Sequence, residues 1–295
     1  LDRVRPPLTI GHQLSLGKLV ASRMGAKVRD RLVAPVTTGV YSASPDDVDI
    51  DVAAPGLNAA LTRVGSLSGA VQTLRDDAAE KAAETQAAAK TPGAAVEGLS
   101  GGMSTLVDAL AADLVRLGAE VRTGVRVRTV RKTGARWSVE AEAEVAAEVE
   151  VRAEESGESA ATDPLEPVVE ELDADAVIIA TPESAARKLL ASAVPALATT
   201  EAASSPEIEI VTLVLDAPEL AAAPRGTGVL TVPGSHTAKA LTHSTAKWGW
   251  VRDAAGARQI VRVSFGAQGE PAATAGLDDA AAADLARREA AALLG

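Results

Sequence analysis

At residues 98–104 the chain reads Gly98-Leu99-Ser100-Gly101-Gly102-Met103-Ser104, a glycine-rich turn that leads into a helical pattern. Four leucines then recur at near-helical spacing, Leu106, Leu110, Leu114 and Leu117. Gly118 is typical of the position just after a helix. Extended stretches follow around Val121, over 125–130 and over 137–139, with a turn at Gly134. The sequence therefore predicts a turn, a helix and extended strands in succession.

A second run, farther along, is apolar without alternation: Ala176-Val177-Ile178-Ile179-Ala180. Because both faces of such a strand would be apolar, we expect it to be fully buried. Thr181-Pro182-Glu183-Ser184 then predicts a turn into a helix. Ligands of α/β proteins bind at the carboxyl ends of buried strands of this kind.

The N-terminal part reads as helices. Ser15 can cap a helix that closes at Gly25, and a second helix carrying Val28, Leu32 and Val33 is expected to stop at Pro35. Both should pack on a core.

Two local signals follow these helices. Ser44-Pro45 predicts a short helical turn. Gly39, between two β-branched residues and just before the only tyrosine, marks a position where the backbone approaches a neighbour closely.

The C-terminal part predicts strands near 208–215, 229–232, 240–243 and 260–265, consistent with a mixed sheet, and a helix over 278–294. The fold class is therefore α/β, with α and β elements mixed (α+β).

Two low-complexity stretches interrupt this pattern. Residues 76–95 read as a solvated helix or linker. Residues 140–172 are acidic and form either an exposed hairpin over 145–151 or, the reading we favour, a solvated excursion.

Composition excludes several classes of function. A net charge of -11 argues against nucleic-acid binding, and the lack of cysteine excludes disulfides and thiolate metal sites. The three histidines, His12, His236 and His243, lack metal-ligand spacing, so no metal is expected. No apolar run is long enough to span a bilayer and the N-terminal residues lack a signal-peptide core, so a cytoplasmic protein is expected.

Several motifs occur in the order found in a known superfamily. Residues 99–110, 123–127 and 174–182 are together similar to the central portion of the flavin-containing amine oxidase superfamily. Within it, residues 15–43, 239–248 and 261–266 resemble the protoporphyrinogen and coproporphyrinogen oxidases.

The resemblance implies an incomplete two-domain flavin-containing amine oxidase fold. A helical part of the substrate domain is expected over 1–97, and an FAD-domain segment over 98–190. The sheet part of the substrate domain, with a terminal helix, is expected over 191–295.

In that family FAD takes a hydride from a methylene bridge of a porphyrinogen and molecular oxygen reoxidises the flavin, in haem biosynthesis. The resemblance thus implies FAD as cofactor, and coproporphyrinogen III or protoporphyrinogen IX as substrate, with coproporphyrinogen favoured. The flavin carries the chemistry, so no catalytic side chain is expected.

Five residues match family positions. Val125 corresponds to a position whose backbone meets the adenine end of FAD, and Gly39 to a glycine that faces the macrocycle. Thr227 and Leu230 correspond to positions that sandwich the tetrapyrrole, and Ser264 lies near a third. Thr227 departs from the family, where an aromatic is familiar.

Substrate propionates require cations, for which the candidates are Arg225, Arg262, Lys239 and Lys247. No Gly-x-Gly-x-x-Gly follows a strand. The 295-residue chain by itself is therefore expected to bind FAD weakly and to be inactive. Another flavoprotein of the superfamily and a non-catalytic tetrapyrrole-binding protein remain as alternatives.

Overall fold

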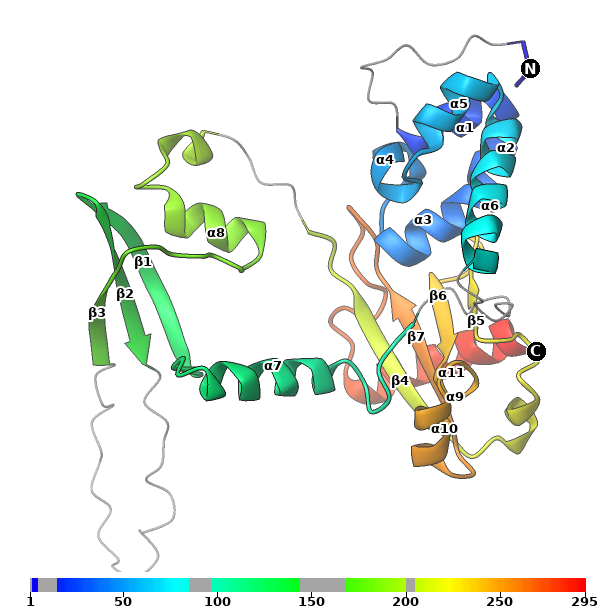
Figure 1. The fold of residues 1–295 in the computed structure, drawn as a ribbon. Helices are drawn as coiled ribbons and strands as arrows, with labels where there is room; N and C mark the ends of the chain where they lie inside the picture. The colour runs from blue at the N-terminus through cyan, green and yellow to red at the C-terminus, as the bar shows by residue number, and fades with distance from the viewer. Residues whose placement is uncertain (1, 5–14, 85–96, 144–167, 200–204) are drawn as a thin grey trace, which may run out of the picture. The chain divides into compact units, whose positions relative to one another are not determined.

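The computed structural model describes residues 2–4, 15–84, 97–143, 168–199 and 205–295 (Figure 1). Two compact units are formed. The first combines Leu1–Thr105 with Ser205–Gly295, and the second is Leu106–Ser204. The expected division into 1–97, 98–190 and 191–295, and the assignment of its parts to substrate and flavin domains, stay predictions.

The N-terminal helices run through α1 (Leu16–Met24), α2 (Ala26–Val28), the π-helical turn η1 (Arg29–Val33) and α3 (Ala34–Tyr41). Helix α1 begins and ends as predicted. The Ser15 hydroxyl accepts a hydrogen bond from the Lys18 N–H at 3.2 Å, and Gly25 follows the last turn with φ of 96°.

The prediction that Pro35 stops the second helix is wrong. Pro35 lies in the first turn of α3, directly after η1, where the Ala34 N–H donates to the Arg29 carbonyl. In a regular α-helix the proline ring would clash with the carbonyl four residues earlier, and a wider π turn relaxes that spacing. Leu32, expected to pack on the core, is exposed in this turn.

The helical part continues with η2 (Pro45–Asp47), α4 (Ile50–Ala53), α5 (Leu57–Val64) and α6 (Leu67–Glu84) (Figure 1). The Ser44 hydroxyl accepts from the Asp46 N–H, which confirms the predicted start of η2. The core of this part is aliphatic and consists of Leu19, Val20, Ile50, Leu57, Ala60, Leu61, Leu67 and Ala70.

Asp2 fastens the beginning of the described chain to α6. Its carboxylate accepts hydrogen bonds from the Leu67 N–H at 2.7 Å and the Ser68 N–H at 3.0 Å, and its carbonyl accepts from buried Arg23. Burial alone would raise the pKa of Asp2, but the hydrogen bonds donated by Ser68, Leu67 and Arg23 outweigh burial and lower the pKa to about 2.

The first unit also contains a four-stranded sheet in the order β4-β7-β6-β5. Its strands are β4 (Glu209–Leu215), β5 (Gly228–Leu230), β6 (Ala240–His243) and β7 (Gln259–Phe265). The expected combination of helices and sheet is confirmed. All pairs among these strands are antiparallel, so the described strands include none of the parallel pairs of a mixed sheet.

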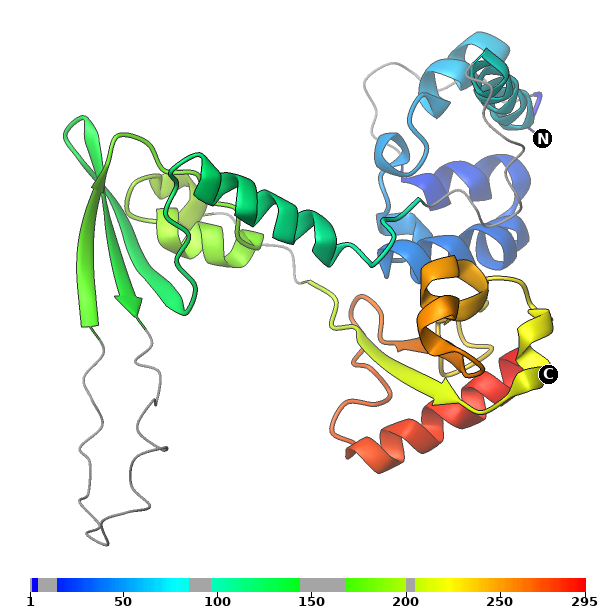
Figure 2. The ribbon, with the colours of Figure 1, turned by 60° about the horizontal axis from the view of Figure 1, so that its bottom comes forward.

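Helix α11 (Asp279–Leu294) covers one face of this sheet (Figure 2). Val261, Val263 and Phe265 of β7 are fully buried on that face, whereas Arg262 between them is exposed. This alternation is the period of a strand with one packed face and one open face. Short helices complete the unit, η4 (Pro218–Ala222), α9 (Ser244–Lys247) and α10 (Gly249–Ala255).

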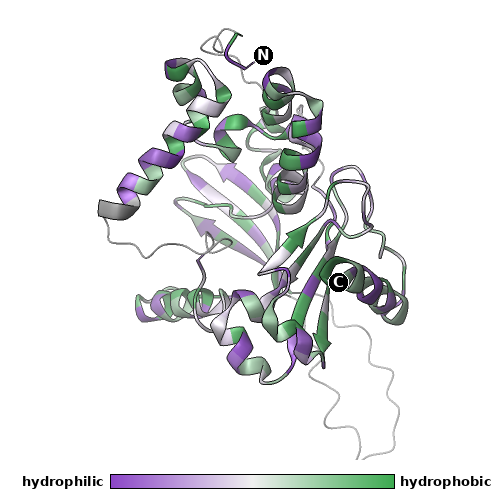
Figure 3. Cartoon of the chain, turned by 90° about the vertical axis from the view of Figure 1, so that its right-hand side faces the viewer, coloured by the Kyte–Doolittle hydropathy of each residue, from purple (hydrophilic) through white to green (hydrophobic). Residues whose placement is uncertain are grey.

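The second unit contains α7 (Ser104–Arg116), β1 (Val125–Thr133), β2 (Arg136–Ala143), β3 (Val168–Ala174), α8 (Glu183–Leu190) and η3 (Pro195–Ala198). The strands pair antiparallel in the order β1-β2-β3. They are mostly hydrophilic, in contrast to the four-stranded sheet (Figure 3). The predicted helix after the glycine-rich turn and the hairpin turn at Gly134 are confirmed.

The prediction of a buried strand over 176–180 is wrong. These residues are not in a strand, and Ile178 is 93% exposed. A strand that is apolar on both faces is buried only where flanking strands and covering helices enclose it, and no described strand pairs with this run. The extended stretch around Val121 likewise forms no strand.

The low-complexity stretches are partly described. Residues 76–84 belong to α6, which confirms the solvated helix, and 85–96 lie outside the described residues. The ends of the acidic stretch form β2 and β3, which pair with each other, so the favoured reading as a solvated excursion is wrong for these ends. The alternating segment 145–151 lies outside the described residues.

None of the described helices combines the length and apolar character needed to cross a membrane.

Candidate functional site

Gly39 and Leu230 are in direct contact. Gly39 lies in α3, and a Cβ atom placed on it would be 2.5 Å from Cδ2 of Leu230, closer than non-bonded carbons approach. The close approach expected at Gly39 is therefore present, and its partner is another residue singled out by the sequence. Only a glycine leaves room for Leu230 in this position.

Leu230 and Ser264 share the open face of the four-stranded sheet. Leu230 is paired with Ala240, and Ala240 is paired with Ser264. Side chains of directly paired residues point to the same side of a sheet. Ile210, which pairs with Ser264, completes this row across all four strands.

Two further rows continue the open face away from α3. The first consists of Gly228, Thr242, Arg262 and Thr212, and the second of Ile260 and Val214. Leu230, Ile210 and Val214 are all exposed large apolar side chains. Ser264, Thr212 and Arg262 lie between these apolar side chains, so the open face is a mixed apolar and polar surface.

The open face ends in a hollow beside α10. This hollow has a volume of about 370 Å³ and is lined by Val214, Trp250, Val251, Ala254, Ala255, Arg258 and Ile260. Val214 and Ile260 belong both to the hollow and to the open face. The face is therefore bounded by Gly39 and Leu230 at one end and by Trp250 at the other.

Thr227 lies immediately before β5. Its carbonyl accepts a hydrogen bond from the His243 N–H at 3.0 Å, so its backbone extends the pairing with β6. Because side chains alternate along a strand, a residue three positions before Leu230 belongs to the opposite side of the sheet. Thr227 therefore contacts the sheet through its backbone. The contact of its side chain with the tetrapyrrole stays a prediction.

His243 is a core residue. Its side chain is buried, and Nε2 lies 3.1 Å from Oε1 of Gln259, which also accepts from the Thr245 hydroxyl. Since an amide oxygen only accepts, Nε2 donates this hydrogen bond, and Nδ1 has no hydrogen-bond partner among the described residues. These contacts make His243 a packing residue of the core.

Val125 belongs to the second unit. It is the first residue of β1, is partly buried, and pairs with Ala143 of β2. Its predicted role towards FAD is neither supported nor opposed by these contacts.

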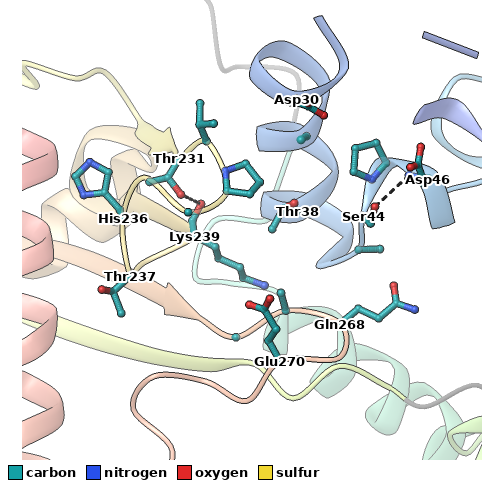
Figure 4. Close-up of a pocket in the computed structure, with 18 of the residues that line it drawn as sticks. Asp30, Thr38, Ser44, Asp46, Thr231, His236, Thr237, Lys239, Gln268 and Glu270 are labelled. Atoms are coloured by element: carbon teal, nitrogen blue, oxygen red, sulfur yellow. Dashed lines mark hydrogen bonds between the residues drawn. The ribbon is translucent and has the colours of Figure 1, made fainter. Parts of the chain in front are cut away.

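A separate cavity of about 660 Å³ lies where α3, the β5–β6 connection and the segment after β7 meet (Figure 4). Its charged and hydroxyl-bearing lining residues are Arg29, Asp30, Thr38, Ser44, Asp46, Thr231, Thr237, Lys239 and Glu270. Thr38 and Thr231 directly precede or follow the Gly39–Leu230 contact in the chain. The cavity is therefore next to the open face.

Lys239 is the cation that reaches into this cavity. Its ammonium donates a hydrogen bond to the Ser42 hydroxyl at the end of α3, and burial lowers the pKa of Lys239. Arg29, in contrast, is paired with Asp30 at 2.7 Å and Asp46 at 3.3 Å. Lys239 thus links the sheet to the helices, a role that its position in the sequence did not reveal.

Comparison with known proteins addresses the family. The family described as flavin containing amine oxidoreductase matches residues 2–295 of the chain. The chain belongs to this family.

Curated relatives are similar at the level of sequence. The coproporphyrinogen III oxidase of Mycobacterium leprae is 30% identical over 281 residues, 91% of this chain and 50% of the relative. That of Mycobacterium tuberculosis is 31% identical over 274 residues, 91% of this chain and 49% of the relative. The chain spans about half the length of the curated relatives it matches.

A solved structure supports the fold. The crystal structure of a protein from Exiguobacterium sp. 255-15, provisionally assigned as a protoporphyrinogen oxidase, matches with a TM-score of 0.69 and 17% identity. The match covers 100% of this chain and 54% of the other chain. The predicted resemblance and fold class are thereby confirmed.

The sequence did not predict that these residues share one face of a sheet. Leu230 and Ser264 were singled out separately, and nothing in the chain order shows that they share a face. The parity of residue numbers within β7 would have grouped Arg262 with Ser264, but only the register of the pairs joins them to Thr242 on β6.

Proposed function

We propose that the open face of the four-stranded sheet binds a porphyrinogen, as the substrate side of an FAD-dependent, oxygen-using porphyrinogen oxidase. The favoured reaction is oxidation of coproporphyrinogen III to coproporphyrin III, in the cytoplasm and as a step of haem biosynthesis. Membership of the flavin amine oxidoreductase family and the names of the Mycobacterium relatives support this choice over protoporphyrinogen IX.

The single observation that carries the proposal is the extent and composition of the open face. Four strands span about 14 Å, and its rows extend about 13 Å along β7. Its side chains are aliphatic or bear hydroxyl groups, except for Arg262. A flat, largely apolar ring system with polar substituents at its rim matches such a surface.

Gly39 and Leu230 border the face on the side of α3. In the proposal their contact separates when the macrocycle binds, and Leu230 then packs against one side of the ring. The absence of a side chain at Gly39 allows the ring to approach the backbone of α3. FAD, when bound, would supply the hydride acceptor. The residues of this chain bind and orient the substrate and exclude water from one of its faces.

The sequence has no Gly-x-Gly-x-x-Gly after a strand, which favours a second candidate function, non-catalytic binding of a tetrapyrrole. It also supports the inference that the 295-residue chain alone is inactive. Both candidates share the open face and differ in whether substrate is oxidised.

Titration of the chain with coproporphyrin III, followed by quenching of tryptophan fluorescence, tests the shared part. Leu230→Asp should abolish the quenching, because a carboxylate on the open face repels a carboxylate-bearing ligand and stays hydrated where the ring would pack. Val71→Asp, an equally exposed apolar residue on α6, serves as the matched control. Equal binding by both variants would exclude the open face as the site.

Oxidation separates the two candidates. Coproporphyrinogen III is incubated with the chain, FAD and air, and porphyrin fluorescence is followed above the rate without protein. Binding without oxidation supports a tetrapyrrole-binding role for the chain. Stoichiometric, tightly held flavin after purification, with turnover, would disprove the inference that the chain alone is inactive.

A further inference from the structure

Arg262 stands in the middle of the open face. It lies on β7, an inner strand of the sheet, and pairs with Thr212 on one side and Thr242 on the other. Along β7 it is flanked on the same face by Ile260 and Ser264. Its side chain is exposed, so the guanidinium belongs to the surface that the proposed ligand would cover.

No described residue neutralises this guanidinium. Arg262 takes part in none of the side-chain hydrogen bonds or ion pairs of the described chain, whereas Arg23, Arg29 and Arg128 each contact a carboxylate. The other members of the three rows are uncharged. The face therefore presents one unpaired cation to its ligand.

Arg258 adds a second guanidinium at the end of the face. It precedes β7, shares the parity of Ile260 and Arg262, and lines the hollow beside Trp250. It too has no carboxylate partner among the described residues. Four residues along a strand correspond to about 13 Å, so the two cations can meet different substituents of one ligand.

Burial of an exposed guanidinium beneath an apolar ligand is unfavourable unless a counter-charge replaces the lost water. A carboxylate is the group whose geometry fits the guanidinium fork, with two parallel N–H···O hydrogen bonds. An uncharged ring would thus be rejected by this face, whereas a ring bearing carboxylates would be held in a fixed orientation.

We propose that Arg262 binds a peripheral carboxylate of the tetrapyrrole and so selects carboxylate-bearing ligands, with Arg258 available to a second carboxylate. This inference rests on the proposed function, because it takes the ligand of the open face to be a tetrapyrrole. Of the four candidate cations named from the sequence, it selects Arg262, because the strand register places this residue on the open face.

The test compares coproporphyrin III with its tetramethyl ester, which has the same ring and no charge. Binding to the chain is followed by tryptophan quenching, with Arg262→Gln, Arg262→Lys and the control Arg288→Gln. Arg288 is exposed on α11, which covers the opposite face of the sheet. Circular dichroism and thermal unfolding establish that each variant is folded.

Arg262→Gln should weaken binding of the acid at least about tenfold, the order of a charge-assisted hydrogen bond, and leave the ester unchanged or bound more tightly. Arg262→Lys should bind the acid with intermediate affinity, and Arg288→Gln should behave as wild type. Added salt should weaken binding of the acid to wild type more than to Arg262→Gln.

Equal affinity of wild type and Arg262→Gln for the acid would overturn the inference while the proposed function stands. Equal weakening of acid and ester binding in Arg262→Gln would also overturn it, because Arg262 would then contribute to the shape of the surface and not to recognition of the carboxylate. Failure of the wild-type chain to bind either porphyrin would overturn the proposed function together with this inference.

Discussion

Replacement of Gly39 by alanine tests the contact that borders the open face. The new methyl group would lie 2.5 Å from Cδ2 of Leu230. Leu230 is 43% exposed, so its side chain can rotate away without leaving a buried void. Gly39→Ala should therefore leave the fold intact and weaken ligand binding at the open face.

The stability change should be small because two effects oppose each other. Alanine in a helix interior is favoured over glycine by about 1 kcal/mol. A leucine forced away from its rotamer costs about 0.5–1.5 kcal/mol. The free energy of unfolding should thus stay within about 1 kcal/mol of wild type.

Ligand affinity should respond more strongly. In Gly39→Ala the methyl group and the displaced Leu230 side chain occupy the edge of the face, so coproporphyrin III should bind about tenfold more weakly, or about 1.4 kcal/mol. Tryptophan quenching measures the affinity and urea unfolding the stability. Val40→Ala, on the exposed neighbour in α3, is the matched control and should bind as wild type.

Removal of the other partner should relieve the clash. Leu230→Ala in the Gly39→Ala background should bind nearly as well as Leu230→Ala alone, giving a coupling free energy of about 1 kcal/mol in a double-mutant cycle. Additive losses, or unchanged affinity of Gly39→Ala, would refute the reasoning.

Three further changes test other contacts. Asp2→Asn should lower stability by about 2 kcal/mol at neutral pH, since the pKa of Asp2 falls from 3.8 to about 2 on folding. Wild type loses that stability as the pH falls from about 4 through 2, so the two urea curves should converge in acid. Phe265→Ala, at a fully buried site, should cost about 3–5 kcal/mol in the same assay. Because burial lowers the pKa of Lys239, wild type should gain thermal stability relative to Lys239→Met as the pH rises towards 10.5, and a constant difference would contradict this.

Local signals in the sequence predicted several helices and the four strands of the four-stranded sheet. Ser15 and Gly25 bound α1, and Ser44 starts η2, because caps act within a few residues of themselves. Strands β6 and β7 were recognisable for a similar reason, since the alternation of apolar residues follows from a single packed face.

The failures depend on structure outside the residues from which each prediction was made. Whether Pro35 ends a helix depends on the turn before it, and a π turn has no reliable local signature. Whether 176–180 is a buried strand depends on neighbouring strands, which the run itself does not specify. The contact of Gly39 with Leu230, and the place of Arg262 between Thr212 and Thr242, depend on the pairing of segments far apart in the chain.

The π turn at Arg29–Val33 also decides how Pro35 is accommodated in α3. Such a turn holds one residue more than an α-helical turn. Deletion of a single residue there would convert it to a regular turn and leave α3 facing the same way, because five π-helical residues turn the chain through nearly the same angle as four α-helical ones. The Pro35 ring would then meet the carbonyl four residues earlier, so the extra residue is what allows a proline within this continuous helical stretch.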